Sequence, residues 1–408
     1  MHLGVRFTHL NLKTKPMMKR YLLFSLASLL PSAGWAVYAP IPEEDQGKAF
    51  VTRLSGGIYH DTNIFGGATD EISSVVYRVS PSLSFNSSVT DQTFLSAGYI
   101  LTYDHVVDRP QNTDLTSHTA SLRIAHAFSD ATTIDFNEQF MVAQNPESLL
   151  AGIPLNTDQS FDNNQFDATF EHALTDRMGM TVKGRSMYYA FDLPALADAL
   201  DRHELLLGIS ANYSVSPATK ISGEYRYLDV GYYNGGSLKN KESHYVLGGF
   251  DYAPSENLAI MARAGWEMRS RSGAPDEDSP YAEVTARYSY GENSFFSAGY
   301  VLGIEEVSNV AVYTDIEVNR VFASVQHAFS PLLIGSAFYS VEPSTLRGRS
   351  GLSPDQDETT QRFGGALTYR PRRAWAVAAT LDIDSTDSDD ATRDLSRTRI
   401  GIDVRYSF

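Results

Sequence analysis

Charged side chains occur at alternate positions in many segments of this chain, and they are the groups that could act chemically. Alternation in a strand places such side chains together on one polar surface. Arginines and carboxylates on that surface either pair with one another, as a braced wall, or create a transverse field that sorts solutes by charge and dipole. The ten candidates for a pore lining are Arg78, Arg123, Asp135, Arg185, Glu224, Arg226, Arg263, Glu267, Arg269 and Arg287.

The chain carries no recognisable catalytic motif. It has no Gly-x-Ser-x-Gly and no phosphate-binding glycine loop, and His203 with Glu204 lacks the second histidine of a zinc-peptidase motif. His60 and Asp61 are adjacent, but adjacent residues in a strand point to opposite faces and form no dyad by themselves. We therefore expect no catalytic residue. An enzyme at the outer rim is the alternative.

Three similar segments end in a turn and carry a histidine just before it: His126, His172 and His327. A shared metal site would need them on neighbouring strands, which they are not, so we interpret them as anchors at a membrane interface. The acidic run 382–390 lacks the glycine and terminal glutamate of an EF-hand loop. We expect no metal and no cofactor, and interpret the acidic loops as a solvated rim bridged to lipopolysaccharide by divalent cations.

Two long loops are too apolar to lie comfortably in water. In loop 143–158 we expect Leu149, Leu150, Ile153 and Pro154 to fold into a lumen and constrict it, or to cover a neighbouring loop. Segment 193–200 has the same character and could form a helical turn. A subunit interface is the rival explanation, and the oligomeric state stays open.

The elements that must position these residues are amphipathic strands. Apolar and polar residues alternate in segments such as 75–85, 258–267, 296–305 and 375–384. Each segment exceeds the roughly nine to eleven residues that a tilted strand needs to cross the hydrocarbon. We predict that one face of each strand contacts lipid and the other faces water inside a barrel.

Breaks between the segments alternate in length. Short turns recur about every 40 residues, and long polar loops lie between them. Short periplasmic turns and long extracellular loops are typical of an outer-membrane barrel. The predicted fold class is therefore all-β, an antiparallel up-and-down transmembrane barrel of about 18 strands by this count of breaks, with 16 as the alternative.

Both ends of the chain favour the same fold. The last strand alternates as far as Tyr406 and Phe408, which resemble the terminal signal that the barrel assembly machinery reads. Residues 1–36 combine a basic start, an apolar run and small residues, as a secretory signal peptide does. Residues 1–16 either belong to it or reflect a start assigned upstream of the true initiator. We expect 37–47 to be a short periplasmic segment and 48–408 to be one barrel domain.

Composition excludes several classes of protein. Residues 1–36 contain five basic residues and no acidic one, so their removal changes the formal charge from −16 to −21. This acidity argues against a nucleic-acid partner. The chain has no cysteine, which excludes disulfides and thiolate metal sites.

Residues 56–65 contain Tyr59, Asp61 and Asn63 in the spacing Tyr-x-Asp-x-Asn. This segment and the C-terminal tail resemble the putative β-barrel porin type 2 family, whose better-studied relatives include barrels associated with exopolysaccharide export. The resemblance implies a channel in the outer membrane of a Gram-negative bacterium, passing small hydrophilic solutes or a polysaccharide. The alternative is a non-conducting scaffold whose loops bind at the cell surface.

Overall fold

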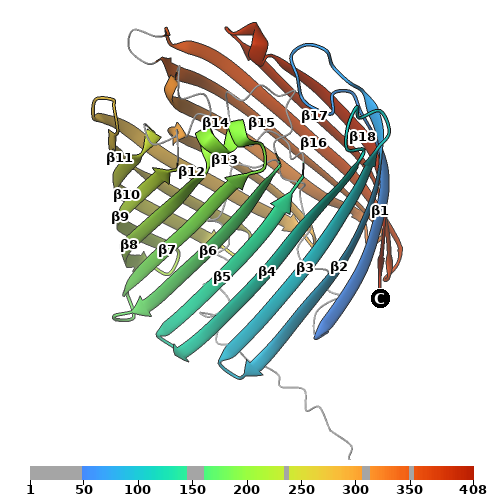
Figure 1. Cartoon of the computed structure of the whole chain (residues 1–408). Helices are drawn as coiled ribbons and strands as arrows, with labels where there is room; N and C mark the ends of the chain where they lie inside the picture. The colour runs from blue at the N-terminus through green and yellow to red at the C-terminus, as the bar shows by residue number, and fades with distance from the viewer. Residues whose placement is uncertain (1–47, 145–159, 234–238, 306–312, 349–352) are drawn as a thin grey trace, which may run out of the picture. The chain divides into compact units, whose positions relative to one another are not determined.

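The computed structural model describes residues 48–144, 160–233, 239–305, 313–348 and 353–408, and these form an antiparallel β-barrel (Figure 1). The strands are β1 (Phe50–Asp61), β2 (Ser74–Thr90), β3 (Thr93–Val106), β4 (Asp114–Ser129), β5 (Thr132–Ala143), β6 (Phe161–Ala173), β7 (Met178–Phe191), β8 (Arg202–Ser216), β9 (Thr219–Tyr232), β10 (Lys241–Ser255), β11 (Leu258–Arg271), β12 (Glu277–Gly291), β13 (Ser294–Glu305), β14 (Tyr313–Ser330), β15 (Leu333–Gly348), β16 (Gln356–Arg372), β17 (Trp375–Ser388) and β18 (Leu395–Ser407).

The sheet closes on itself through its first and last strands. Each strand pairs with its neighbours along the chain, and β1 also pairs with β18, with Leu54 opposite Tyr406 and Ile58 opposite Ile402. This arrangement confirms the predicted up-and-down barrel with 18 strands rather than 16. Closure leaves no sheet edge with unpaired backbone groups, which is what a β-structure needs in order to cross hydrocarbon.

The alternation in the sequence separates the two faces of the sheet, because residues paired across strands share a face. Ile58 pairs with Tyr77 and with Ile402, and all three side chains are exposed on the outer, apolar face. The other face is the inner one. Arg226 of β9 reaches Glu283 of β12 at 3.1 Å, although these strands lie three positions apart, and such a contact is possible only on the concave side.

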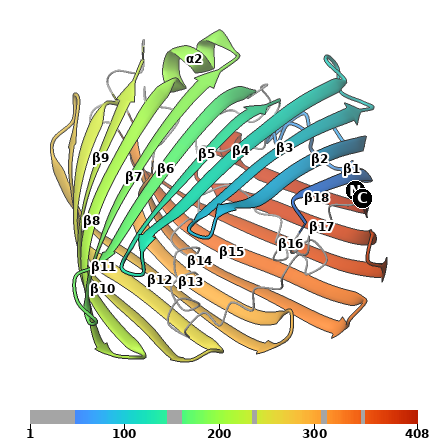
Figure 2. The ribbon, with the colours of Figure 1, turned by 90° about the horizontal axis from the view of Figure 1, so that it is seen from below.

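Connections differ in length between the two ends of the barrel, as expected. At one end two residues join β2 to β3, β4 to β5 and β8 to β9. At the other end the connections are longer, and one of them forms the helix α2 (Pro194–Leu200) (Figure 2). Leu200 is buried against Phe161 and Phe191 on the inner side of β6 and β7, so the predicted helical turn packs onto the inner rim of the mouth.

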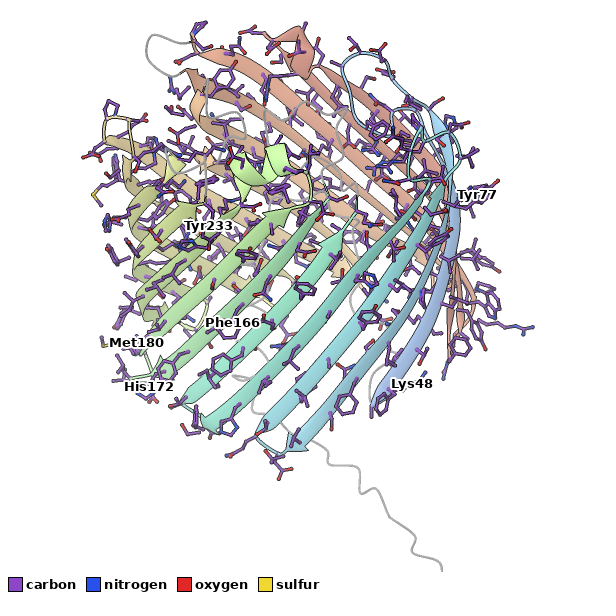
Figure 3. All side chains as sticks on the ribbon, viewed as in Figure 1. Lys48, Tyr77, Phe166, His172, Met180 and Tyr233 are labelled. Atoms are coloured by element: carbon purple, nitrogen blue, oxygen red, sulfur yellow. The ribbon has the colours of Figure 1, made fainter. Side chains whose placement is uncertain are left out.

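Histidine side chains lie on the outer face at the end of the barrel with the short turns, where Figure 3 labels His172. At the end with the short turns, His126 and His172 face outward and each bonds a threonine hydroxyl at 2.9 Å. His327 bonds the hydroxyl of Tyr290 at 3.2 Å. The three histidines belong to β4, β6 and β14, which are not neighbours. Amphipathic rings at these heights suit the headgroup region of a bilayer.

Several predictions concern residues that the structure does not describe. The signal peptide, segment 37–47 and the constriction residues Leu149, Leu150, Ile153 and Pro154 lie outside the described residues. Among those that are described, no helix is both long and apolar enough to cross a membrane.

Candidate functional site

The inner wall of the barrel is the candidate site, and the strand register decides which residues belong to it. Residues paired across neighbouring strands lie on the same face. Glu224 of β9 pairs with Leu247 of β10, which pairs with Gly265 of β11, and such series of pairs can be followed around the whole closed sheet. By this alternation, all ten residues predicted to line a pore occupy positions on the inner face of the sheet: Arg78, Arg123, Asp135, Arg185, Glu224, Arg226, Arg263, Glu267, Arg269 and Arg287. Their role in conduction stays a prediction.

The largest network lies on the wall formed by β9 to β12. Arg226 donates to Glu224 at 2.6 Å and to Glu283 at 3.1 Å. Tyr281 donates its hydroxyl to Glu283 at 2.9 Å and accepts from Arg226 at 3.3 Å. Arg263 donates to Asp251 at 2.6 Å. Both Arg226 and Arg263 thus have at least one carboxylate partner, which neutralises most of the charge of this network.

A similar network lies half-way around the barrel, on β1 to β3. Arg78 forms a bidentate pair with Asp104, at 2.7 and 2.6 Å, and donates to the hydroxyl of Tyr59 at 3.1 Å. Bidentate pairs hold both side chains in one geometry and are among the stronger ion pairs. Asp382 and Asp403 face inward on the adjoining strands β17 and β18, and within the described residues they form no ion pair.

The remaining wall is also paired. Arg123 donates to both carboxylate oxygens of Asp135, and Arg185 donates to Asp167 at 2.7 Å. Arg287, on β12, differs from all of these arginines, because in the described part of the chain its guanidinium has no carboxylate partner and stacks on Phe295, 3.8 Å from the ring centre. Arg287 therefore presents one of the free positive charges of the inner face.

Two of the predicted lining residues are shielded from water. Glu267 accepts from Ser243 at 2.6 Å and is 1% exposed, and Arg269 pairs with Glu277 at 2.7 Å and is 4% exposed. Sequence reasoning missed Asp315, which binds Arg271 at 2.6 Å. Simple alternation would turn Asp315 outward. The pairing shifts register between Tyr313 and Asp315 but is continuous from Asp315 to Val321, so the contact of Asp315 with Arg271 departs from the alternation without a shift that explains it.

The Tyr-x-Asp-x-Asn segment builds the first extracellular loop. Asp61 is buried and accepts two bonds from Arg397, one of them at 3.0 Å from Nε, and one from the backbone N–H of Asn63. The Asn63 amide bonds both the N–H and the C=O of Gly67, at 3.1 and 2.8 Å. Gly66, between them, has a φ of 64°, which favours glycine. Asp61 and Asn63 thus act here as structural residues of the loop.

This loop and the next one line a cavity of about 390 Å³ at the mouth of the barrel, with both polar and apolar side chains in its wall. Phe65, Asp70, Gln111 and Asn112 are among its lining residues. The guanidinium of Arg109 closes one side, where it lies over the Phe65 ring and donates to two backbone carbonyls. The mouth is therefore shaped by ordered loops on this side.

Two other extracellular carboxylates stabilise loop conformations. The hydroxyl and the backbone N–H of Thr392 lower the pKa of Asp390, which caps the short helix η3 (Ala391–Arg393). The backbone N–H of Gly348 and the side chain of Arg347 lower the pKa of Asp355. Both carboxylates therefore remain charged well into the acidic range.

The C-terminal tail was predicted to carry the barrel-insertion signal. Trp375, Tyr406 and Phe408 form an aromatic cluster on the outer face. The ring centre of Tyr406 lies 4.8 Å from that of Trp375 and 4.7 Å from that of Phe408. Phe408 also donates its backbone N–H to Thr52 of β1 at 2.9 Å. The recognition role of Tyr406 and Phe408 stays a prediction.

Comparison with known proteins gives one family match. The sequence pattern of a family described as "Putative beta-barrel porin 2" matches residues 50–408. OccAB4 of Acinetobacter baumannii is a solved structure with 13% identity, 89% of this chain and 100% of its own covered, and a TM-score of 0.47. For OpdK of Pseudomonas aeruginosa, solved with vanillate, these values are 11%, 88%, 99% and 0.48. No curated protein sequence matches the chain.

Proposed function

This chain belongs to the family described as "Putative beta-barrel porin 2", an outer-membrane porin-type barrel, and we propose that it passes small hydrophilic solutes passively through an ion-paired lumen. A barrel of this size encloses a water-filled space unless loops or chain segments plug it. Diffusion through such a space needs no catalytic group. We infer accordingly that the protein is not an enzyme.

The observation that carries the proposal is the separation of the two faces of the closed sheet. The outer face presents apolar side chains such as Ile400 and Ile402, while the inner face carries charged side chains that mostly bond one another, as Arg226 does with Glu224 and Glu283. Mutual pairing leaves a wall rich in hydrogen-bonding groups but low in net charge. Such a wall suits small polar solutes without holding any one of them tightly.

The unpaired charges support weak discrimination among these solutes. Arg287 contributes a positive charge, and Asp382 and Asp403 contribute negative charges on another part of the wall. We infer a modest transverse field rather than strong ion selectivity. The family resemblance also suggests passage of a polysaccharide, which would be a longer solute passing through the same lumen.

The partners that we infer follow from the membrane location. Outer-membrane lipid surrounds the apolar face, and lipopolysaccharide surrounds the extracellular rim. The barrel assembly machinery is the expected reader of Tyr406 and Phe408. A non-conducting scaffold remains the second candidate, favoured by the ordered loop cavity beside Asn63 and Asn112.

Single-channel recording tests the proposal. Purified full-length protein inserted into a planar bilayer should give discrete, reproducible conductance steps, and protein denatured by heat should give none. Liposome swelling with uncharged sugars of increasing size would then measure the size limit. Silence in both assays from protein that still migrates as a folded barrel on unheated gels would favour the scaffold.

A further inference from the structure

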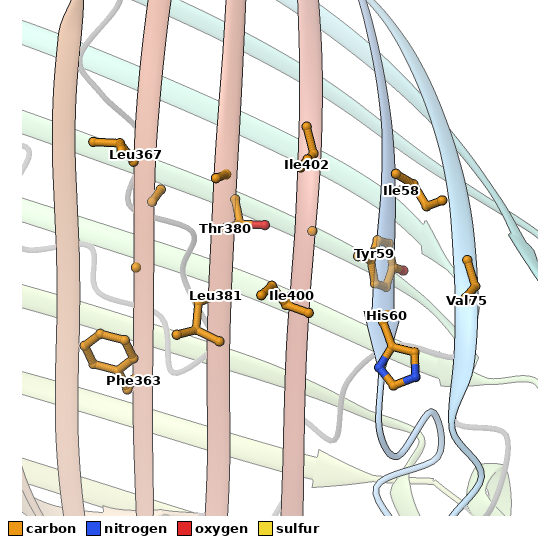
Figure 4. A pocket seen from close by; sticks show the side chains of 14 residues that line it. Ile58, Tyr59, His60, Val75, Phe363, Leu367, Thr380, Leu381, Ile400 and Ile402 are labelled. Carbon is orange, nitrogen blue, oxygen red and sulfur yellow. The ribbon is translucent and has the colours of Figure 1, made fainter.

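A shallow apolar groove crosses the outer face of the barrel where the chain closes on itself (Figure 4). It has a volume of about 700 Å³, and its lining comes from β16, β17, β18, β1 and β2. Leu367 pairs with Ala379, Ala379 with Ile402, and Ile402 with Ile58. Gly365 and Ala379 create the hollow, since larger side chains surround these two small residues.

The groove faces the hydrocarbon of the bilayer. Ile58, Ile400 and Ile402 are exposed side chains of the outer face, and most of the lining is apolar. One end carries His60, which pairs with Val75 one residue inside the extracellular ends of β1 and β2. The groove therefore begins near the extracellular ends of β1 and β2 and runs from there into the apolar band, with its polar end towards the cell surface.

An apolar hollow in this position is filled by whatever surrounds it. Water is excluded from the hydrocarbon, and an empty hollow would lose contacts along its whole length. A second copy of the chain is a poor occupant, because a two-fold symmetric contact places the same patch on both partners and would set hollow against hollow. A flexible hydrocarbon chain can follow the floor of the groove.

We propose that this groove is a binding site for an acyl chain of lipopolysaccharide, the lipid of the outer leaflet. The chain lies along Ala379, Ile402 and Ile58. Its headgroup end meets His60, whose ring N–H can donate to a phosphate or a carbonyl oxygen. The site lies on the outer face and not in the lumen, so an experiment that rules it out would leave the proposed transport function unaffected.

A double substitution that fills the groove tests the proposal. Gly365→Leu combined with Ala379→Leu adds side chains on the outer face, and a Cβ at position 365 would lie 3.4 Å from the flexible Phe363 ring, so the backbone has room for it. The matched control is Gly248→Leu, an outer-face glycine of β10 whose added Cβ meets nothing closer than 3.9 Å. Heat-dependent gel mobility establishes that each variant is folded.

The readout is the lipid that stays bound after purification. Native mass spectrometry of protein extracted from outer membranes in mild detergent should show retained lipopolysaccharide on the original protein and on the Gly248→Leu control. Blocking two or three methylene contacts should reduce retention by the double variant about tenfold. Equal retention by both variants, retention of phospholipid in place of lipopolysaccharide, or a dimer that the double variant dissociates would each overturn the proposal.

Discussion

Individual charges on the inner wall are largely cancelled by their neighbours, and this determines what single substitutions can do. Arg263 is a useful case because it donates to Asp251 at 2.6 Å and lies 3.8 Å from Glu224. Removing its positive charge would leave two carboxylates without their shared partner. The wall beside β11 would then turn from nearly neutral to negative.

Arg263→Glu should therefore shift the channel towards cations. The substitution changes the local charge by two units, and at a distance of ~10 Å in water this alters the energy of a monovalent ion by about 0.8 kcal/mol, about fourfold in its Boltzmann weight. The reversal potential in a salt gradient measures the shift. Arg177→Glu makes the same charge change in the turn between β6 and β7 and serves as the control. An unchanged reversal potential in Arg263→Glu would remove Arg263 from the conducting path.

Asn63 is the residue whose loss should most disturb the extracellular mouth. Asn63→Ala removes an amide that bonds both backbone groups of Gly67, so these buried groups lose their partner at a cost of about 1–3 kcal/mol. Backbone hydrogen exchange in residues 62–73 should accelerate about tenfold or more. Thr69→Ala, which alters the same cavity lining but no hydrogen bond described in the structure, should leave exchange unchanged. Equal exchange in both variants would contradict the role given to Asn63.

Alternation in the sequence predicted the face of each lining residue but not its partner or its burial. The parity rule is local, so it correctly placed Arg226 and Arg263 on one side of the sheet. Burial depends on what surrounds each residue in the barrel, which is why shielded Glu267 looked equivalent to Glu224 in the sequence. The alternation did not indicate Asp315 as an inner residue, because its contact with Arg271 near the start of β14 departs from the parity rule.

At the level of elements, the predicted turns match the structure well and the predicted loops are too long. The polar residues of 344–357 are typical of an irregular loop, yet β15 continues to Gly348 and β16 begins at Gln356. Pairing persists there because residues such as Thr345 and Asp357 bond across the strands at 2.7 Å. Beyond the hydrocarbon both faces of a strand contact water. The alternation of apolar and polar residues in the sequence therefore ends before the strand ends.

The last strand supports a prediction about assembly. Phe408→Ala should lower the amount of folded barrel in the outer membrane several-fold, if the terminal ring is what the assembly machinery recognises. The backbone bond from Phe408 to Thr52 survives this change, so the finished barrel should unfold at nearly the same temperature. Quantitative blots of heat-modifiable protein measure the first effect.

A matched ring elsewhere separates recognition from packing. Phe329 is an exposed ring on the same rim, 62% exposed against 65% for Phe408. Phe329→Ala should therefore leave the amount of folded barrel unchanged. A loss of the same size in both variants would indicate a general packing effect at the interface instead.

For the whole molecule, the distribution of charge is more informative than its sum. The chain carries a formal charge of −16, while the inner wall is mostly paired. The acidic excess thus lies elsewhere, and part of it is on the outer face near the extracellular rim, where Asp229 stands directly opposite Glu242. Like charges in register repel one another. Divalent cations of the lipopolysaccharide layer would relieve this repulsion.

The contact between β1 and β18 has a consequence for how the molecule can be made. The first strand of the barrel finds its second partner only in β18, so no product that lacks β18 can complete the ring. Any prematurely terminated chain would carry two open edges able to pair with other polypeptides. Quality control in the periplasm therefore has an all-or-nothing feature to detect, namely whether a free strand edge is still present.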